Sequence, residues 1–217
     1  RDDRDRSVRG DRDALRGPIL RSVSRSFYLS LRFLPKAIRD PLSLAYLLAR
    51  ATDTIADTVE PPVALRSEGL RDLAAAIQGT ASAKATDALR KSFAPLQTDK
   101  AERTLIEQLP AVLDWLGELS SEDRAEVRSV LLKINRGQSL DLQRFGTATE
   151  IRALRNAAEL DEYTYLVAGC VGEFWTRLCF AHVKNFSDRS ESEMSALGVQ
   201  YGQGLQLINI LRDAGDD

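Results

Sequence analysis

The stretch PLSLAYLLARATDTIAD, residues 41–57, joins an apolar run of helical periodicity to two aspartates, Asp53 and Asp57. Residues four apart on an α-helix share a face, so both carboxylates point in one direction. Like charges at this spacing repel each other by roughly 0.2–0.5 kcal/mol unless a cation lies between them. The stretch therefore predicts a helix that ends in a pair of carboxylates suited to a cation.

A second aspartate pair of the same spacing, Asp213 and Asp217, follows the apolar segment GLQLINILR at residues 204–212. Gln206 and Asn209 precede the pair at helical spacing, so the four side chains form one polar stripe on an otherwise apolar helix. A helix that is apolar on nearly every side is expected to be buried. Its polar stripe must then face partners or a wet cavity, because a buried unpaired polar group costs about 2–7 kcal/mol.

The charged residues near both pairs suggest a site for a metal ion and a diphosphate. Mg²⁺ binds through one or two carboxylates together with the phosphates of a substrate. Arg50 and Arg212 lie beside the pairs, and the arginine fork suits diphosphate oxygens. We therefore expect the two pairs to face each other across a cleft. The alternative is that each pair is a solvated acidic face and each arginine forms an ordinary ion pair within its helix.

Composition restricts the class of protein. The chain has 217 residues, 43% of them hydrophobic, and a net charge of −2, which supports a sizeable core and argues against a general nucleic-acid binder. Cys170 and Cys179 show neither a disulfide framework nor zinc spacing, so we expect reduced, buried thiols in a cytoplasmic protein. The one histidine, His182, gives little support to a His-ligated metal or a Ser-His-Asp triad. We predict a single domain over residues 1–217, with residues 1–16 as a charged tail or a frayed helix.

Helical periodicity and capping residues recur along almost the whole chain, and strand-type alternation is absent. These patterns predict one all-α bundle. The predicted helices span approximately residues 40–57, 63–78, 86–93, 100–117, 121–145, 149–160 and 161–184, with a last helix that begins near 187–193.

Two groups of small residues lie at helical spacing. Each glycine inside a helix costs about 1 kcal/mol relative to alanine, so a structural return is expected. That return is either close approach of two helices or room for a ligand tail, and the sequence leaves both open. The groups are Ala168, Gly169 and Gly172, and Gly198, Gly202 and Gly204.

Four segments occur in the order SRSF (residues 24–27), RATDTIAD (50–57), YTYLVAGCVG (163–172) and GLQLINILRDAGDD (204–217). Together they resemble the squalene/phytoene synthase family, from residue 24 to the end of the chain. The resemblance implies an all-α, isoprenoid-synthase-type helix bundle. Because members of that family continue past the second aspartate motif, we expect this chain to lack the C-terminal helices.

The resemblance also implies an activity. In that family two allylic prenyl diphosphates condense head to head through a cyclopropyl diphosphate, with Mg²⁺ as the cofactor, and give squalene, presqualene diphosphate or phytoene. Farnesyl diphosphate is the expected substrate ahead of geranylgeranyl diphosphate, and use of NADPH is left open. An apolar product is consistent with peripheral contact with a membrane. The oligomeric state is not implied.

The resemblance assigns roles residue by residue. Tyr163 matches a tyrosine near the reacting carbons, Gln206 and Asn209 match polar residues that line the site, and Asp216 and Gln138 replace a glutamate and a methionine of many members. The implied Mg²⁺ ligands are Asp53, Asp57, Asp213 and Asp217, and the implied diphosphate contacts are Arg25, Arg50 and Arg212.

Two other classes remain open from the sequence. A helical scaffold or assembly factor related to the family would be expected to lose the metal-binding aspartates, and this chain keeps them. A head-to-tail prenyltransferase or terpene cyclase typically has consecutive aspartates in its first motif, whereas Asp53 is followed by Thr54.

Overall fold

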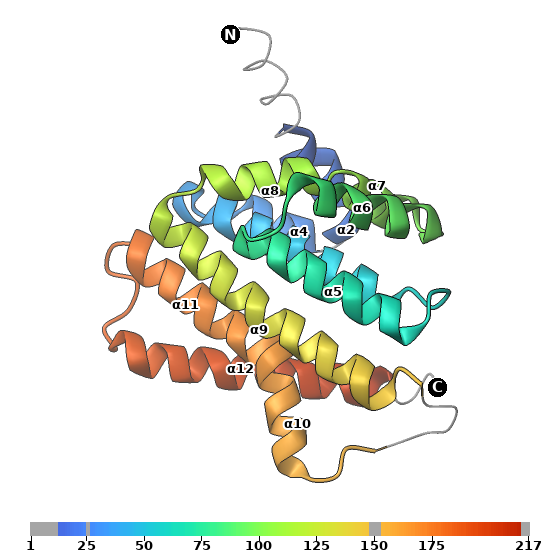
Figure 1. The fold of residues 1–217 in the computed structure, drawn as a ribbon. Helices are drawn as coiled ribbons and strands as arrows, with labels where there is room; N and C mark the ends of the chain where they lie inside the picture. The colour runs from blue at the N-terminus through green and yellow to red at the C-terminus, as the bar shows by residue number, and fades with distance from the viewer. Residues whose placement is uncertain (1–12, 25–26, 148–152, 214–217) are drawn as a thin grey trace, which may run out of the picture. The chain divides into compact units, whose positions relative to one another are not determined.

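The computed structural model describes residues 13–24, 27–147 and 153–213, and every regular element in those ranges is helical (Figure 1). The predicted all-α class is therefore confirmed for the described residues. The predicted site residues Arg25 and Asp217, and residues 1–12 of the predicted tail, lie outside them. The elements are η1 (Leu15–Ile19), α2 (Leu20–Ser24), α3 (Phe27–Arg32), α4 (Lys36–Asp57), α5 (Val63–Gln78), α6 (Ala83–Phe93), η2 (Ala94–Leu96), α7 (Lys100–Glu107), α8 (Leu109–Glu118), α9 (Ser121–Phe145), α10 (Ala157–Thr164), η3 (Tyr165–Gly169), α11 (Cys170–His182) and α12 (Glu191–Asp213).

Several helix boundaries differ from the prediction, among them the start of α6 at Ala83 in place of residue 86. Helix α4 begins at Lys36, with Pro35 as its N-cap, and contains Pro41 in its second turn. The predicted helix over residues 100–117 is two helices, because Pro110 near the start of α8 has no N–H with which to continue the hydrogen bonding of α7. Residues 153–156 of the helix predicted over 149–160 are not helical, and α10 begins at Ala157, where the side chain of Asn156 caps it.

The chain forms two compact units, Arg1–Leu131 and Leu132–Asp217, and each is described by itself. The predicted single domain over the whole chain stays a prediction. None of the helices in the described ranges has the length and apolar character needed to cross a bilayer.

Helix α4 lies at the centre of the core of the first unit, where it contacts α5, α7 and α8. Its core-facing side chains are completely buried. They recur every three or four residues, which is the spacing of a single helix face. Those with no exposed area are Leu44, Leu47, Leu48, Ala51 and Ile55.

In the second unit, α11 and α12 lie side by side at backbone contact (Figure 1). A Cβ atom added at Gly172 would lie 1.9 Å from the carbonyl oxygen of Gly198, and one added at Gly202 would lie 2.4 Å from that of Ala168. The small residues therefore serve close helix packing at these positions. Gly204 is different, because an added Cβ would meet nothing within 4 Å.

The predicted burial of α12 is wrong for several of its apolar residues. Tyr201 is 71% exposed, Leu205 46%, Ile208 62% and Leu211 76%. The physical reason is that α12 packs on α10, η3 and α11 through its glycine-bearing face. The opposite apolar face consequently remains exposed in the described structure.

We predict opposite effects of alanine at two glycines of this pair of helices. Gly172→Ala should lower the free energy of unfolding by at least about 2 kcal/mol, because overpacking against backbone cannot be relieved by a side-chain rotation. Gly204→Ala should raise the free energy of unfolding by up to about 1 kcal/mol. Alanine lowers the backbone entropy of the unfolded chain, and position 204 has room for its methyl group. Urea unfolding of both variants and the parent chain measures the difference, and equal effects would contradict the close packing.

Candidate functional site

The C-terminal half of α4 divides into a buried and an accessible face. Leu47, Leu48, Ala51 and Ile55 point into the core of the first unit. The same periodicity places Arg50, Asp53 and Asp57 on the other side, where Arg50 and Asp53 are half-buried and Asp57 is exposed. The two aspartates lie one helical turn apart, as the sequence predicts.

The end of α4 is fixed by polar contacts that satisfy its last carbonyl groups. The hydroxyl of Thr58 donates to the carbonyl of Thr54 at 2.6 Å and accepts from Nε2 of Gln97 at 2.9 Å. Arg66 of α5 donates from Nη1 to the carbonyl of Ala56 at 3.1 Å. Terminal helix carbonyls otherwise lack partners, so these contacts hold the last turn in place. Asp57 therefore projects from an ordered helix end.

Arg50 is held by a carboxylate that the sequence analysis did not single out. Its Nη2 donates to Oε1 of Glu102 in the first turn of α7. The Nε atom of Arg50 is buried and has no hydrogen-bond partner in the described structure. A buried donor without an acceptor is costly, so an anion that reaches this guanidinium gains a ready donor. The one local signal for Glu102 is its position after the N-cap Asp99, which equally explains an ordinary helix start.

The carboxyl of Asp57 has an unfavourable environment for its charge. Partial removal from water raises the pKa of Asp57, and the nearby Glu102 raises it further, while Arg50 and Arg66 act in the opposite direction. The ionised form is thus incompletely compensated although the side chain reaches solvent. A cation beside Asp53 and Asp57 would supply the missing compensation. Their carboxylate oxygens are the hard donors that Mg²⁺ prefers, so this half of the predicted site fits the metal.

The second predicted motif belongs to the other unit. Gln206, Asn209 and Arg212 lie on the continuous helix α12, with the first two half-buried and Arg212 exposed. Asp213 is the last residue of α12, and its side chain, like Asp217, lies outside what is described. Among the residues that the structure describes, no group of three or more His, Cys, Asp or Glu could hold a metal ion. The shared site of four aspartates therefore stays a prediction.

Tyr163 is half-buried in the last turn of α10. The backbone beside it is tied to α12, because Nε2 of Gln203 donates to the carbonyl of Asp161 and to the hydroxyl of Thr164, both at 3.2 Å. The π-helical turn η3 follows directly. Irregular turns of this kind occur often at functional sites in helical proteins.

A second polar cluster in this unit was not predicted from the sequence. Glu173 accepts hydrogen bonds from Lys133 at 2.8 Å, from the hydroxyl of Tyr165 at 3.0 Å and from Arg177 at 2.7 Å. Burial raises the pKa of Glu173, but the bonds from Lys133 and Tyr165 outweigh burial, and the net pKa is lowered. Three hydrogen-bond donors compensate the carboxylate, and the cluster connects α9, η3 and α11.

Both cysteines behave as the sequence predicts. Cys170 and Cys179 are free and buried. Burial raises the pKa of Cys170 to about 12, so its thiol stays protonated at neutral pH. A protonated, buried thiol is a poor nucleophile and a poor metal ligand.

The chain is similar in sequence to known squalene synthases. The chain is 26% identical over 199 residues to squalene synthase ERG9 of Saccharomyces cerevisiae and 27% identical over 200 residues to squalene synthase BSS of Botryococcus braunii. The alignments cover 92% of this chain but 42% and 39% of the two relatives, so the chain spans about two fifths of their length.

Solved structures show the same fold. A complex of TcSQS with a ligand is 24% identical, has a TM-score of 0.68 and is matched over 94% of this chain and 54% of that chain. A second TcSQS complex is 23% identical with a TM-score of 0.60. These similarities confirm the predicted all-α bundle of isoprenoid-synthase type. The family model for squalene/phytoene synthase matches residues 20–217, and the chain therefore belongs to the squalene/phytoene synthase family.

Proposed function

We propose that the protein is a Mg²⁺-dependent prenyltransferase that joins two prenyl diphosphates head to head through a cyclopropyl diphosphate. The observation that carries this proposal is the end of α4, where Arg50, with a buried unpartnered Nε, lies one turn before Asp53 and about two turns before Asp57. The names of the relatives favour farnesyl diphosphate, since squalene contains two farnesyl units. Squalene, presqualene diphosphate and phytoene remain the candidate products.

Arg50 and the aspartates divide the work of holding a diphosphate. Arg50 donates charge-assisted hydrogen bonds to its oxygens, and an arriving anion competes with Glu102 for the guanidinium. Asp53 and Asp57 would serve as Mg²⁺ ligands, and the family resemblance gives Asp213 and Asp217 the same role. When bound, Mg²⁺ stabilises the negative charge that develops on the leaving diphosphate.

The remaining proposed residues act on the organic part of the substrate. Loss of diphosphate leaves an allylic cation, which survives only in an apolar site without water. The ring of Tyr163 can stabilise that cation, and its hydroxyl can move a proton. Arg25 and Arg212 are further diphosphate contacts, and Gln206 and Asn209 line the same site.

Product analysis tests the proposed reaction. The chain is incubated with Mg²⁺ and either farnesyl or geranylgeranyl diphosphate, with and without NADPH. We expect a product of two prenyl units joined head to head. A head-to-tail chain or a cyclic terpene would contradict the proposal. Absence of any product together with absence of Mg²⁺-dependent diphosphate binding would favour the scaffold alternative.

Arg50→Ala should weaken binding of inorganic diphosphate in the presence of Mg²⁺ by roughly 1.5–3 kcal/mol, the usual range for a charged hydrogen bond. Calorimetry measures the change. Arg90→Ala is a matched control. The side chain of Arg90 is 33% exposed and that of Arg50 is 36% exposed, and each is paired with a carboxylate. Equal affinities of the two variants would mean that Arg50 serves only its ion pair with Glu102.

Asp57→Asn should stabilise the metal-free chain and weaken its response to metal. Because the pKa of Asp57 is raised, its favourable contribution to stability is complete at low pH and is lost as pH rises through the folded-state pKa. At pH 7 the charge is unfavourable, and its removal should raise Tm by about 1 °C. Added Mg²⁺ and diphosphate should raise Tm less in this variant than in the parent chain.

Asp72→Asn on α5 is the control for that experiment, because Asp72 is exposed and its removal likewise deletes one negative charge. It should leave the response of Tm to Mg²⁺ and diphosphate unchanged. A reduced response in both variants would show that net charge, and not the position of Asp57, determines metal binding.

Tyr163→Phe keeps the aromatic ring and deletes the hydroxyl. We expect turnover to fall by about 10²-fold or more if the hydroxyl transfers a proton, with little change in binding of farnesyl diphosphate. Tyr201→Phe is the control, because Tyr201 is 71% exposed on α12. Unchanged turnover in both Tyr163→Phe and Tyr163→Ala would remove this residue from the mechanism.

A further inference from the structure

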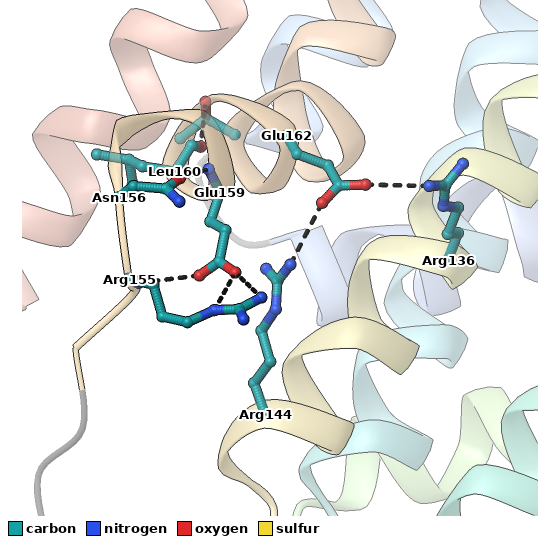
Figure 2. A network of polar contacts seen from close by, with 8 residues as sticks. Arg136, Arg144, Arg155, Asn156, Glu159, Leu160 and Glu162 are labelled. Atoms are coloured by element: carbon teal, nitrogen blue, oxygen red, sulfur yellow. Dashed lines mark hydrogen bonds and ion pairs between the residues drawn. The ribbon is translucent and has the colours of Figure 1, made fainter.

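The last turn of α10 is joined to α9 by a carboxylate shared between two arginines (Figure 2). Arg136 donates from Nη2 to Oε1 of Glu162 at 3.0 Å, and Arg144 donates from Nη2 to Oε2 at 3.2 Å. Each carboxylate oxygen thus accepts a hydrogen bond from one arginine. The arginines are eight residues apart (144 minus 136), about two helical turns, so Glu162 bridges two separate points along α9.

The opposite side of the same turn is joined to α12 through Gln203, which donates to the carbonyl of Asp161 and to the hydroxyl of Thr164. Tyr163 lies in sequence between Glu162 and Thr164. The turn that carries Tyr163 is therefore tied to two different helices. Two ties in different directions restrict the rotation of a helix about its axis more strongly than a single tie does.

The π-helical turn η3 explains why α10 needs ties of its own. It separates α10 from α11, whose position is fixed by the backbone contact of Gly172 with Gly198. A π-turn changes the rotational register of a helix relative to regular α-geometry. The orientation of Tyr163 consequently does not follow from the position of α11 alone.

Another glutamate on the same helix shows the contrast. Glu159 accepts hydrogen bonds from the backbone N–H of Arg155 at 2.9 Å and from its Nε at 2.6 Å (Figure 2). Arg155 immediately precedes the N-cap of α10, so this ion pair is local to the start of the helix. The pKa of Glu159 is lowered chiefly by its bonds from Arg155 and last by the charge of Arg144. Glu159 is thus hydrogen-bonded to the residue before its own helix, whereas Glu162 is hydrogen-bonded directly to α9.

We propose that Glu162 is a positioning residue for Tyr163. By bridging Arg136 and Arg144 it sets the rotation of α10 and thereby the direction in which the tyrosine side chain points. The consequence for the reaction rests on the proposed function of Tyr163. The positioning itself is inferred from the contacts of Glu162 and Gln203 and does not depend on that function.

A spectroscopic experiment tests the positioning directly. The chain is labelled with 3-fluorotyrosine, and the ¹⁹F resonance of Tyr163 is assigned among the five tyrosines by its loss in Tyr163→Phe. In Glu162→Gln, which keeps the shape of the side chain and removes its charge, the resonance should shift or broaden. In Glu159→Gln, which removes one charge from the same helix, it should stay in place. An unmoved resonance in Glu162→Gln, or equal movement in both variants, would overturn the proposal.

A double-mutant cycle on turnover tests the consequence for the reaction. Glu162→Gln should lower kcat by about tenfold, less than the roughly 100-fold that a misplacement of 1 Å can cost, and leave KM unchanged. In the Tyr163→Ala background, which lacks both ring and hydroxyl, it should have no further effect. Multiplicative effects of Glu162→Gln and Tyr163→Ala would overturn positioning through Tyr163.

The two experiments separate the inference from the proposed function. If the resonance moves in Glu162→Gln but both Tyr163→Phe and Tyr163→Ala turn over normally, the tie on α10 is supported and the reactive role of Tyr163 is overturned. If Tyr163→Phe is slow and Glu162→Gln is not, Tyr163 keeps its role and Glu162 loses its own.

Discussion

The complete burial of one face of α4 is the constraint on which the candidate site depends. Leu44, Leu47, Leu48, Ala51 and Ile55 have no exposed area, and burying each of the larger side chains contributes about 1.5–3 kcal/mol. This contribution is large relative to the repulsion between two aspartates one turn apart. The core therefore determines which face of the helix is accessible, and the charged residues occupy that face at a modest energetic cost.

The second unit is organised on a different principle. The most extensive helix contacts of this unit are those of α12 with α11 and with η3. Both depend on glycines, which have no side chain and let the two backbones approach closely. Ion pairs then adjust what the backbone leaves undetermined, as Glu173 does between α9 and α11 and Glu162 between α9 and α10. In the second unit, backbone packing sets the positions of the helices and ion pairs then adjust them. In the first unit, burial of apolar side chains makes the main contribution.

Local patterns in the sequence were sufficient for much of the helical structure. Helices α5 and α9 have the predicted ends, and Arg50, Asp53 and Asp57 share the predicted face. The partners of Glu102 and Glu162 could not be predicted, because they lie 52 residues and 18 or 26 residues away in the chain. Periodicity reports which side of a helix is polar, not what that side meets. The burial of α12 was overestimated for a related reason: apolar character shows what could be covered, not what covers it.

The contact between Gly172 and Gly198 has a consequence for how the sequence can vary over time. The atom that excludes a side chain at position 172 is a carbonyl oxygen, and every amino acid at position 198 carries that same atom. A second substitution at the facing position therefore cannot relieve the clash, as it could between two bulky side chains. Descendants of this chain can replace Gly172 only by separating the two helices, so selection should act on this residue independently of its neighbour's identity.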